Sequence, residues 1–270
     1  MDKIKIHGLS FFAHHGVFEQ EKIKGQEFII DCEFEIDTSR CNDQLDKTVN
    51  YGEVSLDIVD FATKNQYDLL ETLANKLARY LLGKFHLMAG LTLTIHKPNA
   101  PIPTKFDDVT LTIHRQWTTA FLATGSNLGD RQANLDSVLD QIAADPNMEL
   151  AGKSSYLETP PYGVVDQPDF YNGVIKIQTI YTPYELLDFC HRVETLAGRV
   201  RKRRWGERTL DVDILTFGDV VIYNDNLKIP HPEMHLRDFV LKPLCEIEPY
   251  LIHPVLKKNV TALLKELSEN

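Results

Sequence analysis

Hydrophobic and polar residues alternate along the stretch 26–37, where apolar residues stand at every second position from Phe28 to Ile36. This period of two predicts a half-buried antiparallel strand, because successive side chains of a strand point to opposite faces. Similar patterns predict three more strands, around residues 3–9, 91–97 and 109–115. Apolar residues three or four positions apart predict two helices, over residues 54–62 and 69–81. The resulting order, ββααββ, describes an α+β unit.

A second series of elements begins at Thr118 with an apolar strand that ends in GSNLG, residues 125–129. One helix is predicted from there to about Ala144, and another from Pro183, a residue favoured in the first turn, to about Ala197. Three more strands are predicted near residues 149–158, 171–180 and 210–217, followed by short helices. The order βαββαβ is that of a ferredoxin-like domain. The restart of the pattern divides the chain into two domains, 1–116 and 117–270.

The 270 residues are 43% hydrophobic and 25% charged, with a formal net charge of −10. These fractions are typical of a globular protein, and the negative charge argues against a molecule that binds nucleic acid through its bulk charge. No apolar run reaches the ~18 residues of a membrane span, and the N-terminus alternates like a strand, unlike a signal peptide. The four cysteines have no metal-binding spacing, which predicts buried thiols. We therefore expect a cytoplasmic protein with no membrane or nucleic-acid partner.

Two aspartates, Asp211 and Asp213, lie two positions apart in an apolar strand, so both carboxylates point to one face. Six of the ten residues 199–208 before them are lysine or arginine. Such carboxylates suit Mg²⁺, and arginines suit the charge of a phosphoryl group during its transfer. Taken singly, paired aspartates more often belong to a solvated face. A basic run on its own is usually a solvent-facing patch or a patch that binds nucleic acid. Taken together they predict a site for Mg²⁺ and a nucleotide, in a chain that has neither a P-loop nor a Rossmann glycine motif.

The segment RWGERTLDVDIL, residues 204–215, resembles the signature of the 6-hydroxymethyl-7,8-dihydropterin pyrophosphokinases. The resemblance covers most of residues 119–255 and includes GSNLG at 125–129, TPPYG at 159–163, QPDFYN at 167–172, IPHP at 229–232 and RDFVLKPL at 237–244. Glu207 and Phe170 depart from it, at positions often taken by proline and tyrosine. The resemblance implies transfer of a pyrophosphoryl group from ATP to the hydroxymethyl group of a pterin, with release of AMP.

The same resemblance implies roles for individual residues. Asp211 and Asp213 would hold two Mg²⁺ ions that bridge the triphosphate of the co-substrate ATP, while Arg199 and Arg208 stabilise the transferring group. The ATP-binding residues would be Glu194 (on the ribose), Arg201, Arg204, Ile214, His231 and Arg237. The pterin-binding residues would be Thr159, Pro160, Tyr162, Phe170, Asn172, Trp205 and Phe239, with the ring held between Trp205 and Phe239. The loop between residues 198 and 208 is expected to close over ATP.

The first domain resembles dihydroneopterin aldolase over nearly its whole length. The matching segments are GLSFFAHHGV at 8–17, Glu21, GQ at 25–26, VNYGEV at 49–54, LLETLA at 69–74 and KPNAPIP at 97–103. By itself Glu71 is a first-turn glutamate of the usual kind, which interacts with the helix dipole or is solvated, and Lys97 is a surface lysine at the end of a strand. His14 and His15 face opposite ways on a strand, which favours a packing or turn role.

This resemblance implies retro-aldol cleavage of dihydroneopterin with release of glycolaldehyde, in a T-fold (tunnelling-fold) domain that needs no cofactor because the pterin ring accepts the electrons. Lys97 would act as general acid and base, with a pKa lowered by partial burial. Glu71 would anchor the aminopyrimidinone edge, helped by the Leu70 backbone, and Glu21 and Tyr51 would bind hydroxyls and shuttle protons. The family implies a homo-oligomer, a tetramer or octamer through the N-terminal domain, in which Tyr51 serves a neighbour's Lys97.

Three alternatives stay open. Only one domain could be active, with the other an assembly module. The basic run could bind RNA, which predicts binding that weakens steeply with salt and is insensitive to Asp211→Ala. Lys97 could form a Schiff base, which borohydride would trap in the presence of substrate.

Overall fold

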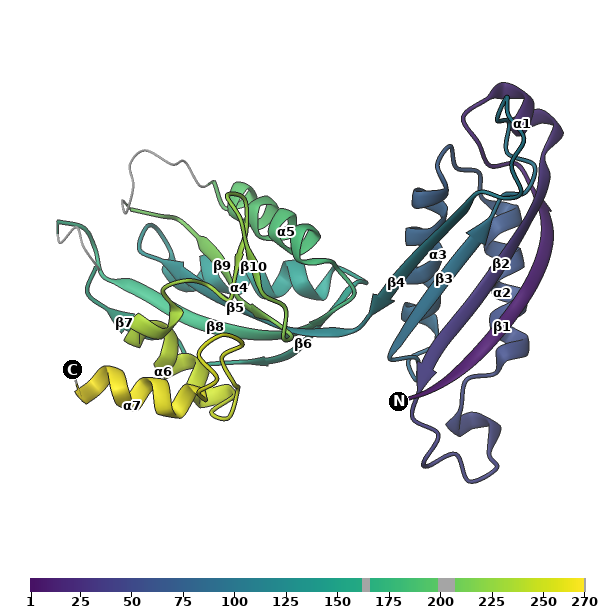
Figure 1. The fold of residues 1–270 in the computed structure, drawn as a ribbon. Coiled ribbons are helices and arrows are strands. Elements are labelled where there is room, and N and C mark those ends of the chain that lie inside the picture. Colours follow the sequence, from purple (N-terminus) through teal and green to yellow (C-terminus); the bar gives the residue numbers. More distant parts are fainter. Residues whose placement is uncertain (162–165, 199–206, 270) are drawn as a thin grey trace. The chain divides into compact units, whose positions relative to one another are not determined.

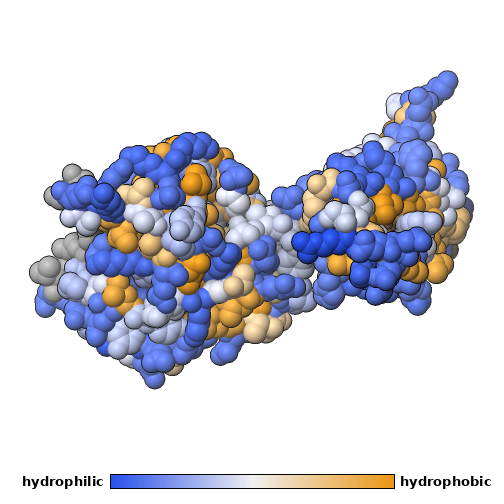
Figure 2. Space-filling view, turned by 90° about the horizontal axis from the view of Figure 1, so that it is seen from below, coloured by the Kyte–Doolittle hydropathy of each residue, from blue (hydrophilic) through white to orange (hydrophobic). Residues whose placement is uncertain are grey.

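The computed structural model describes residues 1–161, 166–198 and 207–269, and these fall into two compact units, Met1–Trp117 and Thr118–Asn270 (Figure 1). All four cysteines are free thiols. Hydrophilic residues dominate the face shown in Figure 2, with apolar residues scattered among them. Within the described ranges, no helix combines the length and apolarity that a membrane span requires.

The first unit is a four-stranded antiparallel sheet in the order β1-β2-β3-β4. Its elements are β1 (Asp2–Ala13), α1 (Glu19–Lys24), β2 (Gln26–Ile36), the 3₁₀ turn η1 (Leu45–Lys47), α2 (Tyr51–Lys64), α3 (Leu70–Lys84), β3 (Gly90–His96) and β4 (Thr110–Gln116). The ββααββ order is as predicted, but β1 is longer than expected and α1 is an additional element. Helix α1 was missed because six residues, EQEKIK, are too few to show an apolar period.

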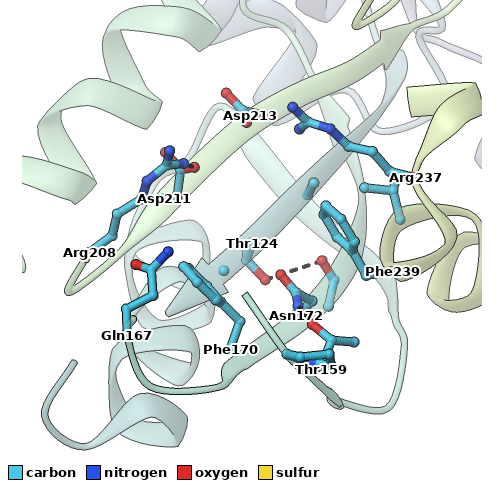
Figure 3. Close-up of a pocket in the computed structure, with 15 residues that line it drawn as sticks. Thr124, Thr159, Gln167, Phe170, Asn172, Arg208, Asp211, Asp213, Arg237 and Phe239 are labelled. Atoms are coloured by element: carbon cyan, nitrogen blue, oxygen red, sulfur yellow. Dashed lines mark hydrogen bonds and ion pairs between the residues drawn. The ribbon is translucent and has the colours of Figure 1, made fainter. Parts of the chain in front are cut away.

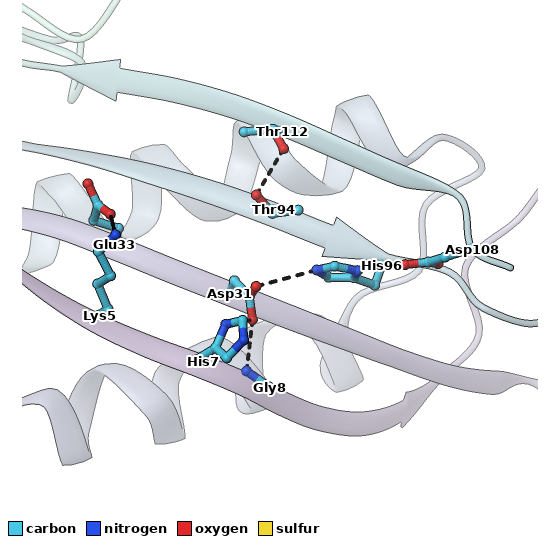
Figure 4. A network of polar contacts seen from close by, with 9 residues as sticks. All are labelled: Lys5, His7, Gly8, Asp31, Glu33, Thr94, His96, Asp108 and Thr112. Atoms are coloured by element: carbon cyan, nitrogen blue, oxygen red, sulfur yellow. Dashed lines mark hydrogen bonds and ion pairs between the residues drawn. The ribbon is translucent and has the colours of Figure 1, made fainter.

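The two faces of this sheet differ as the alternation in β2 predicts. Phe28, Ile30 and Phe34 have no exposed surface, and they lie in the core with apolar residues of α2 and α3. The opposite face carries polar pairs between neighbouring strands (Figure 4): an ion pair joins Lys5 to Glu33, and a hydroxyl–hydroxyl bond joins Thr94 to Thr112. The unit therefore has its core on one side of the sheet only.

The second unit contains a sheet in the order β6-β8-β5-β9, with all neighbours antiparallel. Its elements are β5 (Thr118–Ser126), α4 (Arg131–Ala143), β6 (Met148–Lys153), β7 (Leu157–Thr159), β8 (Phe170–Thr179), α5 (Pro183–Leu196), β9 (Asp211–Phe217), β10 (Ile222–Tyr223), β11 (Lys228–Ile229), the 3₁₀ turn η2 (Met234–Leu236), α6 (Asp238–Ile247) and α7 (Val260–Glu269). The short hairpin of β10 and β11 was not predicted.

The strand predicted near 149–158 is in fact two strands, β6 and β7, which pair with successive parts of β8. The interruption has a local cause at Ser154. Its N–H donates to the Val174 carbonyl oxygen at 2.9 Å, and its hydroxyl accepts the Val174 N–H at 2.9 Å. Because the hydroxyl takes the place of a backbone acceptor, the regular ladder stops and starts again three residues later.

Strand β5 lies at the centre of this unit and is buried on both faces, which explains its nearly continuous apolar sequence. Ala120 and Leu122 belong to a core cluster with apolar residues of α4 and α5. Phe121, between them, belongs to a second cluster with residues of α6 and α7 on the opposite face (Figure 1). Two packed layers therefore hold β5 and β9 in place, and both strands contribute to the site described below.

Candidate active sites

In the first unit, the structure brings Lys97 and Glu21 together, although 76 positions separate them. Lys97 follows β3 directly, and its Nζ lies 2.5 Å from Glu21 Oε1. The two side chains are only 11% and 7% exposed. Because a buried charge is costly without a partner, each residue stabilises the other in place. Among the site residues predicted for this unit, Lys97 and Glu21 are the only two that the single chain brings together as a possible acid–base couple.

The Glu21 carboxylate is held from several sides. Its Oε2 accepts the Phe18 N–H at 3.0 Å, and its Oε1 accepts a hydrogen bond from Gln26 Nε2 at 3.0 Å. Burial by itself would raise the pKa of Glu21, but the bonds from Lys97 and Phe18 and the charge of Lys97 outweigh it, so the pKa is lowered. Gly16 has a φ of +148°, and a Cβ there would lie 2.2 Å from Glu21 Cδ. Glycine is therefore required where the carboxylate packs.

Glu71 and Leu70 form the first turn of α3. The N–H groups of a first turn have no acceptor within the helix, so the Leu70 N–H is available to a ligand next to the exposed Glu71 side chain. Tyr51 begins α2, and its side chain is 64% exposed. Among the described residues, no hydrogen bond joins Tyr51 to Lys97. Within one chain, therefore, the structure pairs Lys97 with Glu21 and leaves Tyr51 on the surface.

In the second unit, a pocket opens beside the central strands (Figure 3). Its wall contains nine residues that the sequence analysis selected: Thr159, Pro160, Phe170, Asn172, Arg208, Asp211, Asp213, Arg237 and Phe239. These residues belong to β7, β8, β9 and the start of α6 or to the segments beside them, so three-dimensional packing gathers them from three parts of the sequence. Five further predicted residues, Tyr162, Arg199, Arg201, Arg204 and Trp205, lie outside the described residues, as does most of the loop expected to close over ATP.

Asp211 and Asp213 both line the pocket, which confirms that they share one face of β9. They lie opposite Gly125 and Ala123 of β5, two small residues. Burial, and then repulsion by Asp211, raise the pKa of Asp213 to about 7. An ion pair joins Arg208 Nη1 to Asp211 Oδ2. Two carboxylates that repel each other in a buried place fit a divalent cation well, because the cation would neutralise both.

The described residues contain no group of three or more acidic, histidine or cysteine side chains that could hold a metal ion. A cation at Asp211 and Asp213 would therefore take its remaining ligands from phosphate groups and water. This is the usual arrangement for Mg²⁺, which keeps several waters and is bound through one or two carboxylates together with substrate phosphates. The donor set thus fits Mg²⁺ accompanied by a nucleotide.

His231 and Arg237 lie on the segment that leads from β11 into α6. His231 Nδ1 accepts the Glu233 N–H at 3.2 Å, which leaves the ring proton on Nε2. Burial and the charge of Arg237 lower the pKa of His231 to about 4. At neutral pH, His231 is therefore an uncharged hydrogen-bond donor, whereas Arg237 supplies positive charge.

This lowered pKa has a measurable consequence for stability. The unfolded chain binds a proton at this histidine near pH 6.5, but the native protein does so only near pH 4. Between these values protons favour the unfolded state, so we expect His231 to reduce the free energy of unfolding, by up to ~1.4 kcal/mol per pH unit as pH falls. Urea unfolding at pH 7 and pH 5 should show this fall diminished in His231→Gln and unchanged in His191→Gln, at an exposed position. Equal pH dependence in both variants would contradict it.

Of the described residues predicted to bind ATP, Arg237 lines the pocket, whereas Glu194, Ile214 and His231 do not. Glu194 is 5% exposed, and its Oε1 accepts the Val212 N–H at 2.9 Å, which satisfies a backbone donor of β9. Ile214 is 5% exposed and packs in the core. A contact of Ile214 with ATP would therefore involve its backbone, and Glu194 has a structural bond in addition to its predicted role.

The side of the pocket away from the aspartates combines amide and aromatic groups. Asn172 Nδ2 donates to Thr159 Oγ1 at 2.7 Å, and the rings of Phe170 and Phe239 line the pocket near this pair (Figure 3). Gln167 also lines the pocket, although no role was predicted for it. Nor was a role predicted for Gln26 of the first unit, which donates to Glu21. Both belong to the segments that carry the family resemblances, which was the available signal.

An acid–base pair in one unit, and paired carboxylates with arginines beside an aromatic pocket in the other, define an enzyme with two chemically distinct sites. Two family models match the chain: dihydroneopterin aldolase over residues 4–114 and 7,8-dihydro-6-hydroxymethylpterin-pyrophosphokinase over residues 121–249. The chain belongs to the pyrophosphokinase family and carries a dihydroneopterin aldolase domain before it; it is a bifunctional enzyme that catalyses these two steps of folate biosynthesis.

Known proteins resemble the chain over one or both halves. The 2-amino-4-hydroxy-6-hydroxymethyldihydropteridine pyrophosphokinase of Haemophilus influenzae is 45% identical over 152 residues, which are 56% of this chain and 94% of that protein. The folic acid synthesis protein FOL1 of Dictyostelium discoideum is 30% identical over 285 residues, covering 95% of this chain and 43% of that protein. The crystal structure of Escherichia coli dihydroneopterin aldolase in complex with neopterin covers 43% of this chain and 99% of its own, with 24% identity and a TM-score of 0.40.

Proposed function

We propose that residues 117–270 form a ferredoxin-like domain that binds ATP and the hydroxymethyl pterin in the pocket of Figure 3. The observation that carries this proposal is that one pocket contains groups suited to a nucleoside triphosphate and groups suited to a pterin. Asp211, Asp213, Arg208 and Arg237 give one part of the wall the charges that a triphosphate with Mg²⁺ requires. The other part has the flat apolar rings and polar amides that a pterin requires, and the catalysed transfer needs the two ligands in contact.

In this proposal, Asp211 and Asp213 hold two Mg²⁺ ions, which neutralise charge on the phosphate oxygens when bound. Arg208 exchanges its ion pair with Asp211 for the transferring phosphates, and Arg237 and neutral His231 bind the remaining phosphate oxygens. Asn172 orients the pterin so that its hydroxymethyl oxygen attacks the β-phosphorus. The bond from that phosphorus to the α–β bridging oxygen breaks, AMP leaves, and the hydroxyl proton is released. Arg199, Arg201, Arg204, Trp205 and Tyr162 are proposed to complete the site.

We infer that residues 1–116 form a T-fold domain in which Lys97 and Glu21 carry out the proton transfers of the aldolase step. The buried ion pair between them carries this inference, since it places an acid and a base 2.5 Å apart. Glu71 and the Leu70 N–H anchor the pterin edge at the start of α3. Together with Glu21, Lys97 takes up the hydroxyl proton of the second side-chain carbon as the bond between the first and second carbons breaks. The pterin ring holds the electron pair, and a proton is returned to the first carbon as glycolaldehyde leaves.

The aldolase site is proposed to form between subunits of a cytoplasmic homo-oligomer, a tetramer or octamer, with Tyr51 of one subunit next to Lys97 of another. The exposed position of Tyr51 supports this arrangement, because a side chain that is 64% exposed in the single chain is available to a neighbour. The proposal that both domains are active, and not one alone, is supported by charged groups in each: the Lys97–Glu21 pair in the first unit, and Asp211, Asp213, Arg208 and Arg237 in the second.

Subunit complementation tests this arrangement. Tyr51→Phe and Lys97→Ala are each expected to lack aldolase activity. Mixed oligomers of the two, formed by unfolding and refolding together, should regain activity, because about a quarter of the sites receive both native residues by random assembly. Glycolaldehyde release from the mixture is the measurement, and each variant refolded alone is the control. A mixture as inactive as its components would place both residues in the same subunit's site.

A further inference from the structure

Asn127 directly follows β5 and is only 2% exposed, and the sequence predicted no role for it. Its backbone N–H donates to the Arg208 carbonyl oxygen at 3.1 Å, and its Oδ1 accepts the Arg208 N–H at 2.8 Å. On the other side, its Nδ2 donates to Gln167 Oε1 at 3.2 Å and to the Pro168 carbonyl oxygen at 3.1 Å. One buried side chain therefore joins two segments that are about forty residues apart in the sequence.

These two segments contribute different parts of the pocket wall (Figure 3). Arg208 is ion-paired with Asp211 and belongs to the side proposed to bind ATP. Gln167 leads into Phe170 and Asn172, on the side proposed to bind the pterin. A second contact holds the segment on the pterin side, since Arg131 Nη1 donates to the Asp169 carbonyl oxygen at 2.8 Å. Arg131, however, does not bond to Arg208, whereas Asn127 bonds to both segments.

We propose that Asn127 is a positioning residue that couples the ATP side of the pyrophosphokinase pocket to its pterin side. The amide of Asn127 is planar, and both of its N–H donors are in use. If the backbone at Arg208 shifts as its guanidinium moves from Asp211 to the triphosphate, the amide must move with it or leave a buried group unpaired, which costs free energy. The shift is thereby transmitted to residues 167–168. The inference rests on the proposed assignment of the two sides of the pocket.

The coupling can be measured directly as a ratio of two dissociation constants. The full chain is titrated with 6-hydroxymethyl-7,8-dihydropterin, first alone and then with saturating Mg²⁺ and α,β-methylene-ATP, which cannot transfer its pyrophosphoryl group. Since energetic coupling between sites is typically about 5–150-fold, we expect wild-type enzyme to bind the pterin at least about fivefold more tightly with the nucleotide analogue present. In Asn127→Ala the ratio should fall to within about twofold of one.

The Asn127→Asp variant tests separately the hydrogen bond to Arg208 and the hydrogen bonds to residues 167–168. The variant keeps an oxygen that accepts the Arg208 N–H, but it replaces the donors to Gln167 and Pro168 by a second acceptor. We expect its affinity for the nucleotide analogue alone to stay within about threefold of wild type while the coupling ratio is lost. Linkage also requires that the pterin change the affinity for the analogue by the same factor, which provides an internal check.

Asn134→Ala is the matched control. Asn134 Nδ2 donates to Ser126 Oγ at 3.1 Å and to the Leu128 carbonyl oxygen at 2.8 Å, so it holds the same turn without reaching residues 167–168 or 208. Its coupling ratio should equal that of wild type. Three results would overturn the proposed role of Asn127 but leave the pocket assignment intact: coupling that is retained in Asn127→Asp, coupling that is lost in Asn134→Ala, or a wild-type enzyme that binds both ligands without coupling. If the wild-type enzyme fails to bind either ligand, the assignment of the pocket is overturned as well.

Discussion

Replacement of Asp211 or Asp213 by alanine is expected to abolish AMP formation while glycolaldehyde release continues at the wild-type rate. The two carboxylates are the only acidic side chains in the described pocket wall, so no other group there can hold the cation against the triphosphate. Metal-assisted charge stabilisation contributes several kcal/mol, and ~1.4 kcal/mol corresponds to a factor of ten in rate. We therefore expect the rate of AMP formation to fall at least about a thousandfold. A single reaction with dihydroneopterin and Mg-ATP, in which both products are quantified together, measures both activities.

Although replacement of Asp213 should abolish activity, it should not lower the free energy of unfolding. Burial and repulsion by Asp211 make this carboxylate unfavourable in the folded protein, as its raised pKa of about 7 shows. Asp213→Asn should therefore be at least as stable as wild type at pH 8 without Mg²⁺, although it is inactive in AMP formation. Asp219→Ala, which changes an exposed aspartate just beyond the end of β9, is the control and should leave both properties unchanged. An Asp213→Asn protein that forms AMP at the wild-type rate would contradict the metal site.

Replacement of Lys97 by alanine is expected to have the reverse selectivity, with loss of glycolaldehyde release and unchanged AMP formation from hydroxymethyl-dihydropterin supplied directly. Loss of a positioned general acid or base lowers the rate by about 10²–10⁴-fold. The substitution also leaves the Glu21 carboxylate buried without its 2.5 Å partner. An unpaired buried polar group costs about 1–3 kcal/mol, so the first domain should also lose stability.

The double variant Lys97→Met/Glu21→Gln separates these two effects. It removes both charges while a side-chain carbonyl remains to accept the Phe18 N–H, so it should regain stability but not aldolase activity. Lys22→Ala is the control, because it breaks an ion pair with Asp68 of 2.7 Å whose side chains are 29% and 59% exposed. Exposed pairs contribute little, so this variant should stay close to wild type in both measurements. Loss of AMP formation in Lys97→Ala would show that the two domains do not work independently.

Much of the fold follows from local sequence patterns. The alternation in residues 26–37 predicts both the strand and its buried face, and Phe28, Ile30 and Phe34 are indeed fully buried. The spacing of Asp211 and Asp213 likewise predicts that they share a face, since a strand has a fixed period of two. Elements without a clear period were missed or merged: the six-residue α1, the hairpin of β10 and β11, and the division of one predicted strand into β6 and β7.

The sequence by itself determined the types of most elements, the division near residue 117 and, through two resemblances, the chemistry of each half. Only the tertiary structure decided which distant residues meet. It pairs Lys97 with Glu21 across 76 positions, and it uses Asn127 to join Pro168 to Arg208. The physical reason is that periodicity records which face of an element is buried, whereas these contacts depend on where loops end after the strands and helices have packed. A side chain in such a loop has no period of its own, so its partners are fixed only by the folded chain.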